Sequence, residues 1–386
     1  MSILVQTITE DLVNMKLAVR DFIDNEVDLV ADQIERDDQV PERIMKLSQE
    51  MGLFGLSIPE EYGGLGLNMT GKCGIYEELG RTINGYTTLI GAHTGIGSVG
   101  IVEIGNEAQK QKYLPKMATG EYLGAFALTE PSAGSDATAL QTTAVRKGDK
   151  FIINGSKHYI TNAPEASIFT VMAVTDKTKG AKGITSFIIE KDFPGLVIGK
   201  HEEKMGLRGS HSAEVFFEDC EVPVENVLGE EGMGYVNALR ILANGRAGLA
   251  ARNLGSSQKL LEMSVKYASE RVQFGKPIIE QQIIQHYLAE MAVDIESLRA
   301  LTYSVASQVD ANQKVIKEAA MVKLYGSEVY NRVADKAVQI HGGIGYIREY
   351  AIERYYRDAR ITKIYEGTSE IQKNIIAAQL IKEYLK

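Results

Sequence analysis

The residues that most clearly could do chemistry lie at 365–371, where Tyr-Glu-Gly-Thr-Ser-Glu-Ile separates two helical patterns. Gly367 can adopt backbone angles that a residue with a Cβ resists, so a ligand can come close to the main chain. The carboxylate of Glu366, if screened from water, has a raised pKa and is a candidate general base. Ser369 and Gln372 have the spacing of a capping box, which predicts that the last helix starts there. The alternative is a solvated glutamate in an ordinary helix–helix loop.

Two segments in the middle of the chain could meet a planar or anionic ligand. Residues 122–136 have the pattern of a strand that runs into a loop rich in Ser and Gly, and such loops present N–H groups and hydroxyls to a ligand. Residues 158–162 place Tyr159 close to Thr161, which suits one face of a planar cofactor. The alternatives are a generic β-turn for the first segment and cross-strand packing for the second.

Two further motifs lie in the C-terminal third. Residues 270–277 end a helical pattern with Arg271 and Phe274, which could meet a phosphate and cover a ring; the alternative is a solvated helix end. Residues 339–346 form a Gly-rich break after a long helical pattern, which could cradle a pyrophosphate or serve only as a C-cap and turn. This break is not a Walker loop, because it lacks the ending Gly-Lys-Ser/Thr. It is not a dinucleotide fingerprint either, because it does not follow a strand.

The elements that must position these motifs follow an α, β, α order. Apolar residues recur at helical spacing through most of residues 1–120 and again through 229–386. Between 121 and 228, short β-branched and aromatic runs at 151–153, 168–174, 184–189 and 213–217 predict a compact β-domain. Because the strands lie in one block, a Rossmann sheet of alternating strands and helices is not expected.

Composition and charge exclude several classes of function. The chain has 386 residues and a formal net charge of −9, which argues against general binding to nucleic acid or an anionic membrane. Its two cysteines, Cys73 and Cys220, form no CxxC motif, and the histidines have no metal-ligand spacing. The first residues lack the pattern of a signal peptide, and no run is long enough to span a bilayer. We therefore expect a cytoplasmic protein without a metal.

Taken together and in order, these motifs resemble the acyl-CoA dehydrogenase family of flavoenzymes, from the loop Pro-Glu-Glu-Tyr-Gly-Gly at 59–64 to the Tyr-Glu-Gly-Thr at 365–368. The resemblance implies a mainly helical α+β fold. It would have an N-terminal helical domain (1–120), a central β-barrel or β-sandwich domain (121–228) and a C-terminal four-helix bundle (229–386).

The resemblance also implies roles for individual residues. Glu366 matches the base that removes the α-proton of an acyl-CoA thioester while the β-hydrogen leaves as hydride to FAD. The residues that match positions contacting FAD are Phe126, Leu128, Thr129, Gly134, Ser135, Tyr159, Ile160, Thr161, Arg271, Phe274, Gln282, Gln339, Gly342, Gly343, Thr368 and Glu370. Those that match positions along the thioester path are Ser135, Ala243, Asn244, Arg246 and Gly367.

The implied partners are acyl-CoA and electron-transferring flavoprotein. Contacts from Arg271, Phe274, Gln282 and 339–343 to the cofactor of a neighbouring subunit imply a homotetramer, a dimer of dimers. Some relatives carry the base near Arg246, but here that position is basic and Glu366 is present. Alternatives are an acyl-CoA oxidase, although its extra C-terminal domain is missing, an enoyl-CoA reductase, and a non-catalytic helical scaffold.

Acyl-chain length is suggested by a single feature. The small residues Gly95, Gly97, Ser98 and Gly100 lie in the stretch that lines the acyl tail in this family, and they would leave room for a medium or longer chain. Close helix–helix packing is an equally good explanation of the same residues.

Overall fold

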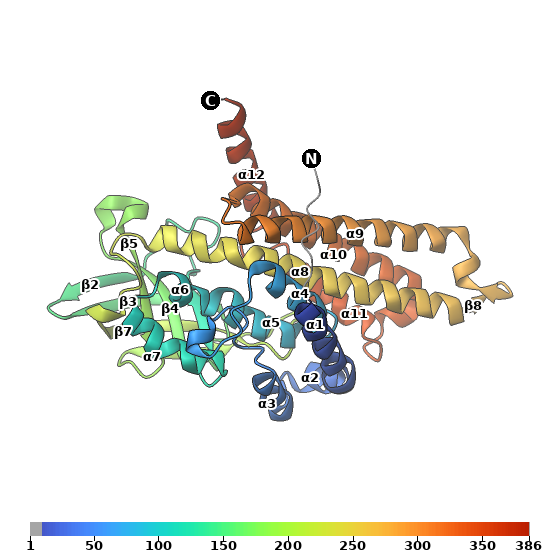
Figure 1. The fold of residues 1–386 in the computed structure, drawn as a ribbon, viewed down its shortest axis with the longest axis horizontal. Helices are drawn as coiled ribbons and strands as arrows, with labels where there is room; N and C mark the ends of the chain where they lie inside the picture. Colours follow the sequence, from blue (N-terminus) through green and yellow to red (C-terminus); the bar gives the residue numbers. More distant parts are fainter. Residues whose placement is uncertain (1–9, 386) are drawn as a thin grey trace.

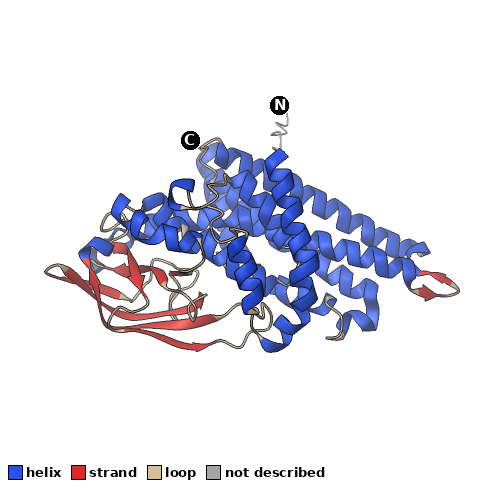
Figure 2. Cartoon of the chain, turned by 60° about the horizontal axis from the view of Figure 1, so that its bottom comes forward, coloured by secondary structure: helices blue, strands red, loops and turns tan. Residues whose placement is uncertain are grey.

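The computed structural model describes residues 10–385 and has the predicted α, β, α order (Figure 1). The strands gather at one end of an elongated molecule, and long helices run from there to the other end (Figure 2). None of the helices within residues 10–385 is long and apolar enough to cross a lipid bilayer. The first residues, which lack a signal-peptide pattern, lie outside the described part of the chain.

The N-terminal part is helical, as its apolar periodicity predicts. Asn106 and Gln109 form a capping box that begins α7, and the Asn68 side chain caps α4. The Pro-Glu-Glu-Tyr-Gly-Gly loop at 59–64 interrupts the helices and contains a short 3₁₀ turn. The elements are α1 (Glu10–Phe22), η1 (Ile23–Val27), η2 (Asp28–Val30), α2 (Ala31–Asp37), α3 (Glu42–Glu50), η3 (Glu60–Tyr62), α4 (Met69–Leu79), α5 (Asn84–Ala92), η4 (His93–Gly97), α6 (Val99–Ile104) and α7 (Glu107–Ala118).

The central part is a seven-stranded mixed sheet in the order β1-β4-β2-β3-β7-β6, with β5 paired to β4. All four predicted strand runs lie within its strands. Only β1–β4 and β2–β4 pair in parallel, so the sheet is not of the Rossmann type. The elements are β1 (Gly124–Ala127), β2 (Thr143–Lys147), β3 (Lys150–Thr161), β4 (Ile168–Val174), η5 (Lys177–Gly183), β5 (Ile184–Glu190), β6 (Leu196–His201), β7 (Ser212–Pro223) and η6 (Val224–Asn226).

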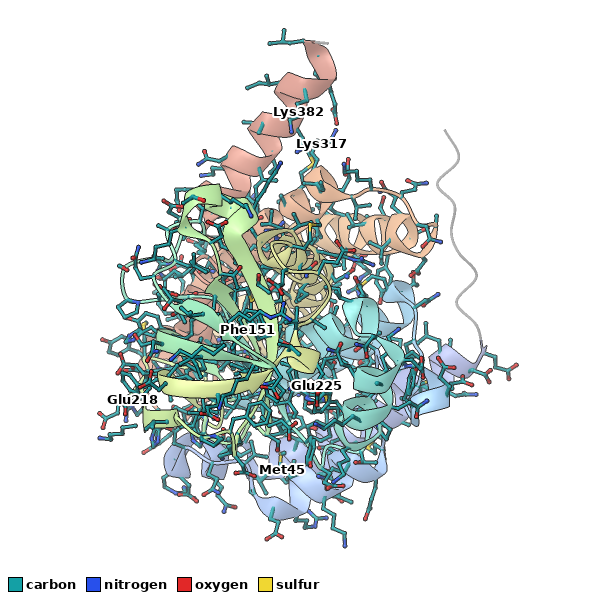
Figure 3. All side chains as sticks on the ribbon, turned by 90° about the vertical axis from the view of Figure 1, so that its left-hand side faces the viewer. Met45, Phe151, Glu218, Glu225, Lys317 and Lys382 are labelled. Atoms are coloured by element: carbon teal, nitrogen blue, oxygen red, sulfur yellow. The ribbon has the colours of Figure 1, made fainter. Side chains whose placement is uncertain are left out.

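The C-terminal part is again helical, as predicted. Helices α8, α9 and α10 lie side by side, and a small β-hairpin joins α8 to α9 at the end of the molecule opposite the sheet (Figures 1 and 2). Seen from the sheet end, with Phe151 in the sheet, α12 projects away from the body and carries Lys382 near its tip (Figure 3). The elements are α8 (Gly234–Glu270), β8 (Val272–Gln273), β9 (Lys276–Pro277), η7 (Ile278–Glu280), α9 (Gln282–Asp310), α10 (Ile316–His341), η8 (Gly342–Tyr346), α11 (Ile352–Ile361) and α12 (Ser369–Tyr384).

Helix α4 from the N-terminal part packs directly on α8, and glycine makes this possible. A Cβ on Gly80 would lie 2.1 Å from the Arg252 carbonyl oxygen, and one on Gly255 would lie 1.9 Å from that of Glu77. Only glycine allows two backbones to approach so closely. Apolar side chains of α4, α8, α9 and α10 share one continuous core, so the two helical parts form one packed unit.

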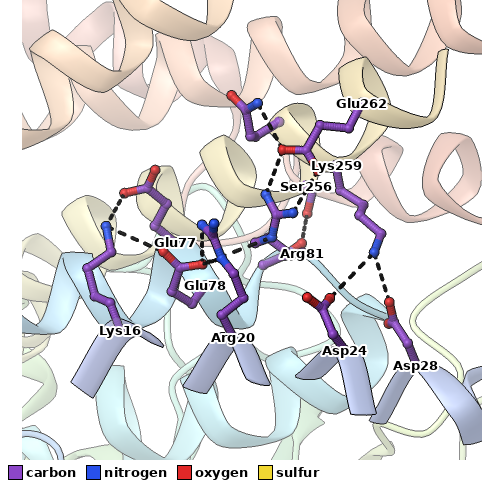
Figure 4. A network of polar contacts seen from close by, with 12 residues as sticks. Lys16, Arg20, Asp24, Asp28, Glu77, Glu78, Arg81, Ser256, Lys259 and Glu262 are labelled. Atoms are coloured by element: carbon purple, nitrogen blue, oxygen red, sulfur yellow. Dashed lines mark hydrogen bonds and ion pairs between the residues drawn. The ribbon is translucent and has the colours of Figure 1, made fainter. Parts of the chain in front are cut away.

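Ion pairs add a second constraint on α4 (Figure 4). Arg20 on α1 lies 2.7 Å from Glu78, which is 1% exposed, and Arg81 after α4 lies 2.7 Å from Glu262 on α8. The buried carboxylate of Glu78 is thus paired, as a buried charge must be. This network fixes the position of α4 along α8, and with it the side chains that α4 presents to the site described below.

Candidate active site

The turn between α11 and α12 carries Glu366 in a left-handed backbone conformation. Its φ angle is 54°, and that of Gly367 is 90°. The sequence suggested such geometry for Gly367 only. A residue with a Cβ pays on the order of 1 kcal/mol for this conformation and keeps it where the surroundings enforce it, which is common at functional sites.

The start of α12 corrects one prediction. The N-cap is Thr368, whose side chain accepts a hydrogen bond from the Ile371 N–H at 3.3 Å, so the capping box predicted at Ser369 is wrong by one residue. Gln372 does not take part in a cap. Its Nε2 donates to the carbonyl oxygens of Glu366 at 3.1 Å and Gly367 at 2.9 Å. The glutamine therefore holds the turn that carries the carboxylate.

A buried lysine holds the same turn from the other side. Lys323 on α10 is fully buried, and its Nζ donates to the Gly367 carbonyl oxygen at 2.7 Å. Burial lowers the pKa of Lys323 to about 8, although the nearby Glu366 carboxylate opposes this shift. Two side chains thus converge on the carbonyl of Gly367 and restrict the turn to one conformation.

The Glu366 carboxylate has the properties of a buried base. Its side chain is 11% exposed, and its Oε2 has no hydrogen-bond partner within residues 10–385. Desolvation raises the pKa of Glu366, while the charges of Arg252, Lys323 and Arg246 oppose this rise. The Arg252 Nη2 lies 3.9 Å from Oε1, which is too far for a hydrogen bond. The carboxylate is therefore free to take up a proton.

Glu366 faces a cavity between α4, α5, η4 and α8. The cavity encloses about 310 Å³ of space not filled by atoms, its open mouth included. A Cβ built on Gly245 would lie 3.0 Å from Glu366 Oε2, so glycine at this position keeps the space beside the carboxylate open. The lining residues are Met69, Lys72, Tyr76, Gly91, Thr94, Gly95, Asn244, Gly245, Gly248, Leu249, Arg252 and Glu366.

The cavity changes the interpretation of the small residues at 95–100. Only Gly95 lines it. A Cβ on Gly97 would lie 2.6 Å from the Gly124 carbonyl oxygen, and one on Gly100 would lie 3.0 Å from Ile241 Cδ1, while Ser98 is fully buried. These three residues serve close packing, so they do not provide the room for a medium or longer acyl chain that the sequence suggested.

The predicted thioester-path residues on α8 occupy different environments. Asn244 lines the cavity, and its Nδ2 donates to Glu103. Arg246 is 5% exposed, its Nε has no partner, and desolvation lowers its pKa. Within the described residues Arg246 forms no ion pair. Ala243 and Ser135 do not line the cavity.

The β-domain brings one predicted group of ligand contacts together. Buried Lys157 forms an ion pair with buried Glu130 at 2.7 Å and donates to the Leu128 carbonyl oxygen at 3.1 Å. The His158 N–H donates to the Thr129 carbonyl oxygen at 2.8 Å. These bonds place residues 128–130, which follow β1, beside the end of β3. The segments around Thr129 and Tyr159 are therefore neighbours in space.

The Tyr159 ring forms an exposed aromatic face near the end of β3. Tyr159 has a φ of 59° and is 65% exposed, whereas Ile160 is buried, so only the backbone of Ile160 could contact a ligand. Gly134 and Ser135 lie exposed in the loop after β1, and a Cβ on Gly134 would meet nothing within 4 Å. The Tyr159 ring contacts His158 along the chain, with centroids 3.9 Å apart, and leaves most of its surface open to a large planar ligand.

A second predicted group lies at the opposite end of the same chain. Arg271 and Phe274 belong to the β8–β9 hairpin region, far from the sheet in Figures 1 and 2, and Phe274 is 94% exposed. The His341 ring stacks on Tyr267 with centroids 4.4 Å apart, which places residues 339–343 at this same end. Gln282 begins α9 there. The structure thus does not bring these residues to Tyr159 within one chain.

Several residues of the site carried no recognisable signal in the sequence, and Gln372 carried only that of a cap. Arg252, Lys323 and Gln372 approach Glu366 or its turn from α8, α10 and α12. Lys72 and Tyr76 reach the cavity from α4. Their positions depend on helix packing between distant segments, which spacing along one helix does not reveal.

Comparison with known proteins identifies relatives along nearly the whole chain. Residues 9–121, 125–220 and 231–381 match, respectively, the families described as the N-terminal, middle and C-terminal domains of acyl-CoA dehydrogenase. The human mitochondrial short-chain specific acyl-CoA dehydrogenase is 42% identical over 95% of this chain and 89% of its own length. An acryloyl-CoA reductase (NADH) of Anaerotignum propionicum is 42% identical over 97% and 96% of the two chains. A structure of a Bacillus anthracis acyl-CoA dehydrogenase complexed with FAD is 37% identical, has a TM-score of 0.92, and is matched over 99% of this chain and 68% of that one.

Proposed function

Because the chain belongs to the acyl-CoA dehydrogenase family of FAD-dependent oxidoreductases, which act on CH–CH bonds, we propose that it converts a saturated acyl-CoA to the trans-2-enoyl-CoA with Glu366 as base. One observation carries this proposal: a buried carboxylate oxygen of Glu366 without a hydrogen-bond partner faces a cavity, and burial raises its pKa. A carboxylate with a higher pKa is a stronger base, so the transfer of a proton to it from carbon is less unfavourable.

The chain's residues fit FAD. The exposed Tyr159 ring would cover one face of the flavin, with Phe126, Leu128, Thr129 and Thr161 around it. FAD, when bound, accepts the β-hydrogen of the substrate as hydride. Thr368 and Glu370, which follow the turn, are the contacts expected from α12.

The backbone of the turn would stabilise the enolate that forms as the α-proton leaves. The Glu366 N–H donates to no acceptor within residues 10–385, so it is available to the thioester oxygen. Lys323 and Gln372 hold the turn by its two carbonyl oxygens, which fixes the direction of this N–H. A preorganised donor of this kind acts most strongly in a site that excludes water.

The remaining predicted contacts require a second subunit. Arg271, Phe274, Gln282, Gln339, Gly342 and Gly343 lie at the far end of the chain from Tyr159. We infer that they meet the FAD of a neighbouring subunit in a homotetramer built as a dimer of dimers. The electron acceptor that we propose is electron-transferring flavoprotein.

The reverse reaction is the second candidate. The acryloyl-CoA reductase relative is as similar to this chain as the human dehydrogenase, at 42% identity. Glu366 with a raised pKa could also deliver a proton to the α-carbon of an enoyl-CoA. The intact, buried Glu366 argues against a non-catalytic scaffold.

The cavity favours a short acyl chain. Tyr76 packs so closely on α8 that a Cβ on Gly248 would lie 2.7 Å from its ring, and this narrows the space next to Glu366. The Tyr76 hydroxyl is fixed by a 2.6 Å hydrogen bond to Thr94. The human relative is also named for short-chain substrates.

The experiment is an anaerobic titration of the purified, flavin-loaded protein with butyryl-, octanoyl- and palmitoyl-CoA, with the enoyl-CoA product identified by mass spectrometry. We expect the flavin absorbance to bleach fastest with butyryl-CoA. If no saturated acyl-CoA bleaches the flavin but enoyl-CoA reoxidises chemically reduced enzyme, the reductase is correct. If neither reacts, the proposed function is wrong.

A further inference from the structure

The cavity beside Glu366 contains a second charged group that the proposed chemistry does not use. Lys72 lies in the first turn of α4 and lines the cavity together with Tyr76, Thr94 and Glu366. Its side chain is partly buried, and within residues 10–385 its ammonium group forms no hydrogen bond or ion pair. A desolvated ammonium group without a partner is unfavourable, so an anion that binds beside it gains a strong interaction.

The two carboxylates that act electrostatically on Lys72, Glu103 and Asp310, are already engaged. Glu103 pairs with Arg240 at 2.6 Å and also accepts from Asn244. Asp310 accepts from the N–H groups of Met69 at 2.6 Å and Thr70 at 3.0 Å, at the N-terminus of α4. Both carboxylates act on Lys72 only at longer range, and desolvation outweighs them, so the pKa of Lys72 is lowered.

Apart from Glu366 Oε2 and Arg252 Nε, the buried polar side-chain atoms of the other lining residues have partners within residues 10–385. Thr94 Oγ1 donates to the Ile90 carbonyl oxygen at 2.8 Å and accepts from Tyr76. Arg252, the other cation in the lining, donates to the Thr87 carbonyl oxygen and faces Glu366. Lys72 therefore differs from Arg252 in that its charged group forms no hydrogen bond or ion pair within residues 10–385.

We propose that Lys72 binds a carboxylate at the far end of the acyl group, so that the substrate is a short ω-carboxyacyl-CoA thioester. This inference rests on the proposed function, which places the α- and β-carbons at Glu366. A carboxylate would form a charge-assisted hydrogen bond with the ammonium group, whereas a plain alkyl end would leave that group desolvated and unpaired. The lysine therefore both attracts one class of acyl group and disfavours the other.

The test compares acyl-CoAs of equal length with and without the terminal carboxylate, namely glutaryl- against valeryl-CoA and adipyl- against hexanoyl-CoA. In the wild-type holoenzyme we expect the better of the two carboxylated substrates to have a kcat/KM about tenfold or more above that of the neutral acyl-CoA of the same length. This is the factor that a hydrogen bond to a charged group supplies. Lys72→Met should remove this advantage and leave the neutral substrates as fast or faster. Lys46→Met, at an exposed site on α3, is the matched control and should change neither.

Binding is measured separately by calorimetry in the Glu366→Gln background, where turnover does not interfere. Lys72→Met should weaken glutaryl- or adipyl-CoA about tenfold and leave the neutral partner unchanged. Thermal melting shows whether the variant is folded; since it removes an unpaired charge, no loss of stability is expected. This inference is overturned if the wild type prefers the neutral acyl-CoAs, or if Lys72→Met loses affinity and kcat/KM equally for carboxylated and neutral acyl-CoAs.

In that case, flavin bleaching by a neutral acyl-CoA would leave the proposed function intact. If no acyl-CoA of either kind bleached the flavin, both the inference and the proposed function would be refuted.

Discussion

At Glu366 two opposing effects set the proton affinity of the carboxylate. Burial disfavours the charged form, and the cations of Arg252, Lys323 and Arg246 favour it. Burial prevails, so the pKa is raised, but the balance depends on each cation. A unit charge about 4 Å away is worth about 4 kcal/mol at an effective dielectric constant of 20, so one cation can move the pKa by more than a unit.

Lys323→Met is predicted to change the pH dependence of the reaction. The base acts in its deprotonated form, so kcat/KM rises with pH through the pKa of Glu366, which lies above its ordinary value of 4.5. Removing the Lys323 charge raises that pKa further, and the acidic limb of the profile should move to higher pH. The turn also loses its 2.7 Å bond to Gly367, so kcat should fall.

Lys317→Met is the control on the same helix, because Lys317 forms a surface pair with Glu383 at 2.7 Å and lies outside the cavity lining. Its profile should match the wild type. An unshifted acidic limb in Lys323→Met would show that this lysine does not tune the base.

At the scale of elements, local patterns predicted the sheet and the helices, because alternation and helical periodicity are properties of neighbouring residues. The run at 168–174 coincides with β4. The capping prediction at Ser369 failed because Gln372 bonds instead to the turn, and side-chain choice there depends on the conformation of Glu366. Lys72 and Arg252 could not be predicted as cavity residues, since the α4–α8 contact that positions them joins segments some 170–180 residues apart.

The β-domain depends on one buried ion pair. Lys157→Met should leave the Glu130 carboxylate buried without its partner, which costs about 3–5 kcal/mol. The loop after β1 should then loosen, because the Glu130 carboxylate also accepts from the N–H groups of Gln141 and Thr142. We expect a lower melting temperature and loss of FAD on gel filtration.

The double variant Lys157→Met/Glu130→Gln tests the cause, because a neutral amide oxygen can still accept from one of these N–H groups. It should recover most of the stability lost in the single variant. A double variant as unstable as Lys157→Met would show that packing around Lys157, and not the unpaired charge, supports the domain.

At the scale of the whole molecule, two groups of residues predicted to bind FAD lie at opposite ends of the elongated molecule. Phe274, almost fully exposed, cannot reach the Tyr159 region of its own chain, so its expected role depends on the proposed tetramer. The domain boundaries at 120/121 and 228/229 and the cytoplasmic location stay predictions from the sequence.

Phe274→Ala is predicted to lower the ratio of bound FAD to protein even though residue 274 is remote from the sheet. Light scattering on the wild type should give the mass of a tetramer. Tyr384→Ala, at another exposed aromatic on α12, should leave the FAD content unchanged. A monomeric wild type that retains FAD fully would contradict the shared site.

The most direct measurement of the central claim is the rate of anaerobic flavin bleaching by the preferred acyl-CoA in Glu366→Gln. The change preserves the shape of the side chain and removes its charge. We predict a rate lower by about 10³-fold, in the range typical of a lost general base, while the acyl-CoA still binds. Glu50→Gln, at an exposed position at the end of α3 and outside the cavity lining, tests whether any loss is particular to Glu366. Bleaching at the wild-type rate in Glu366→Gln would contradict the account.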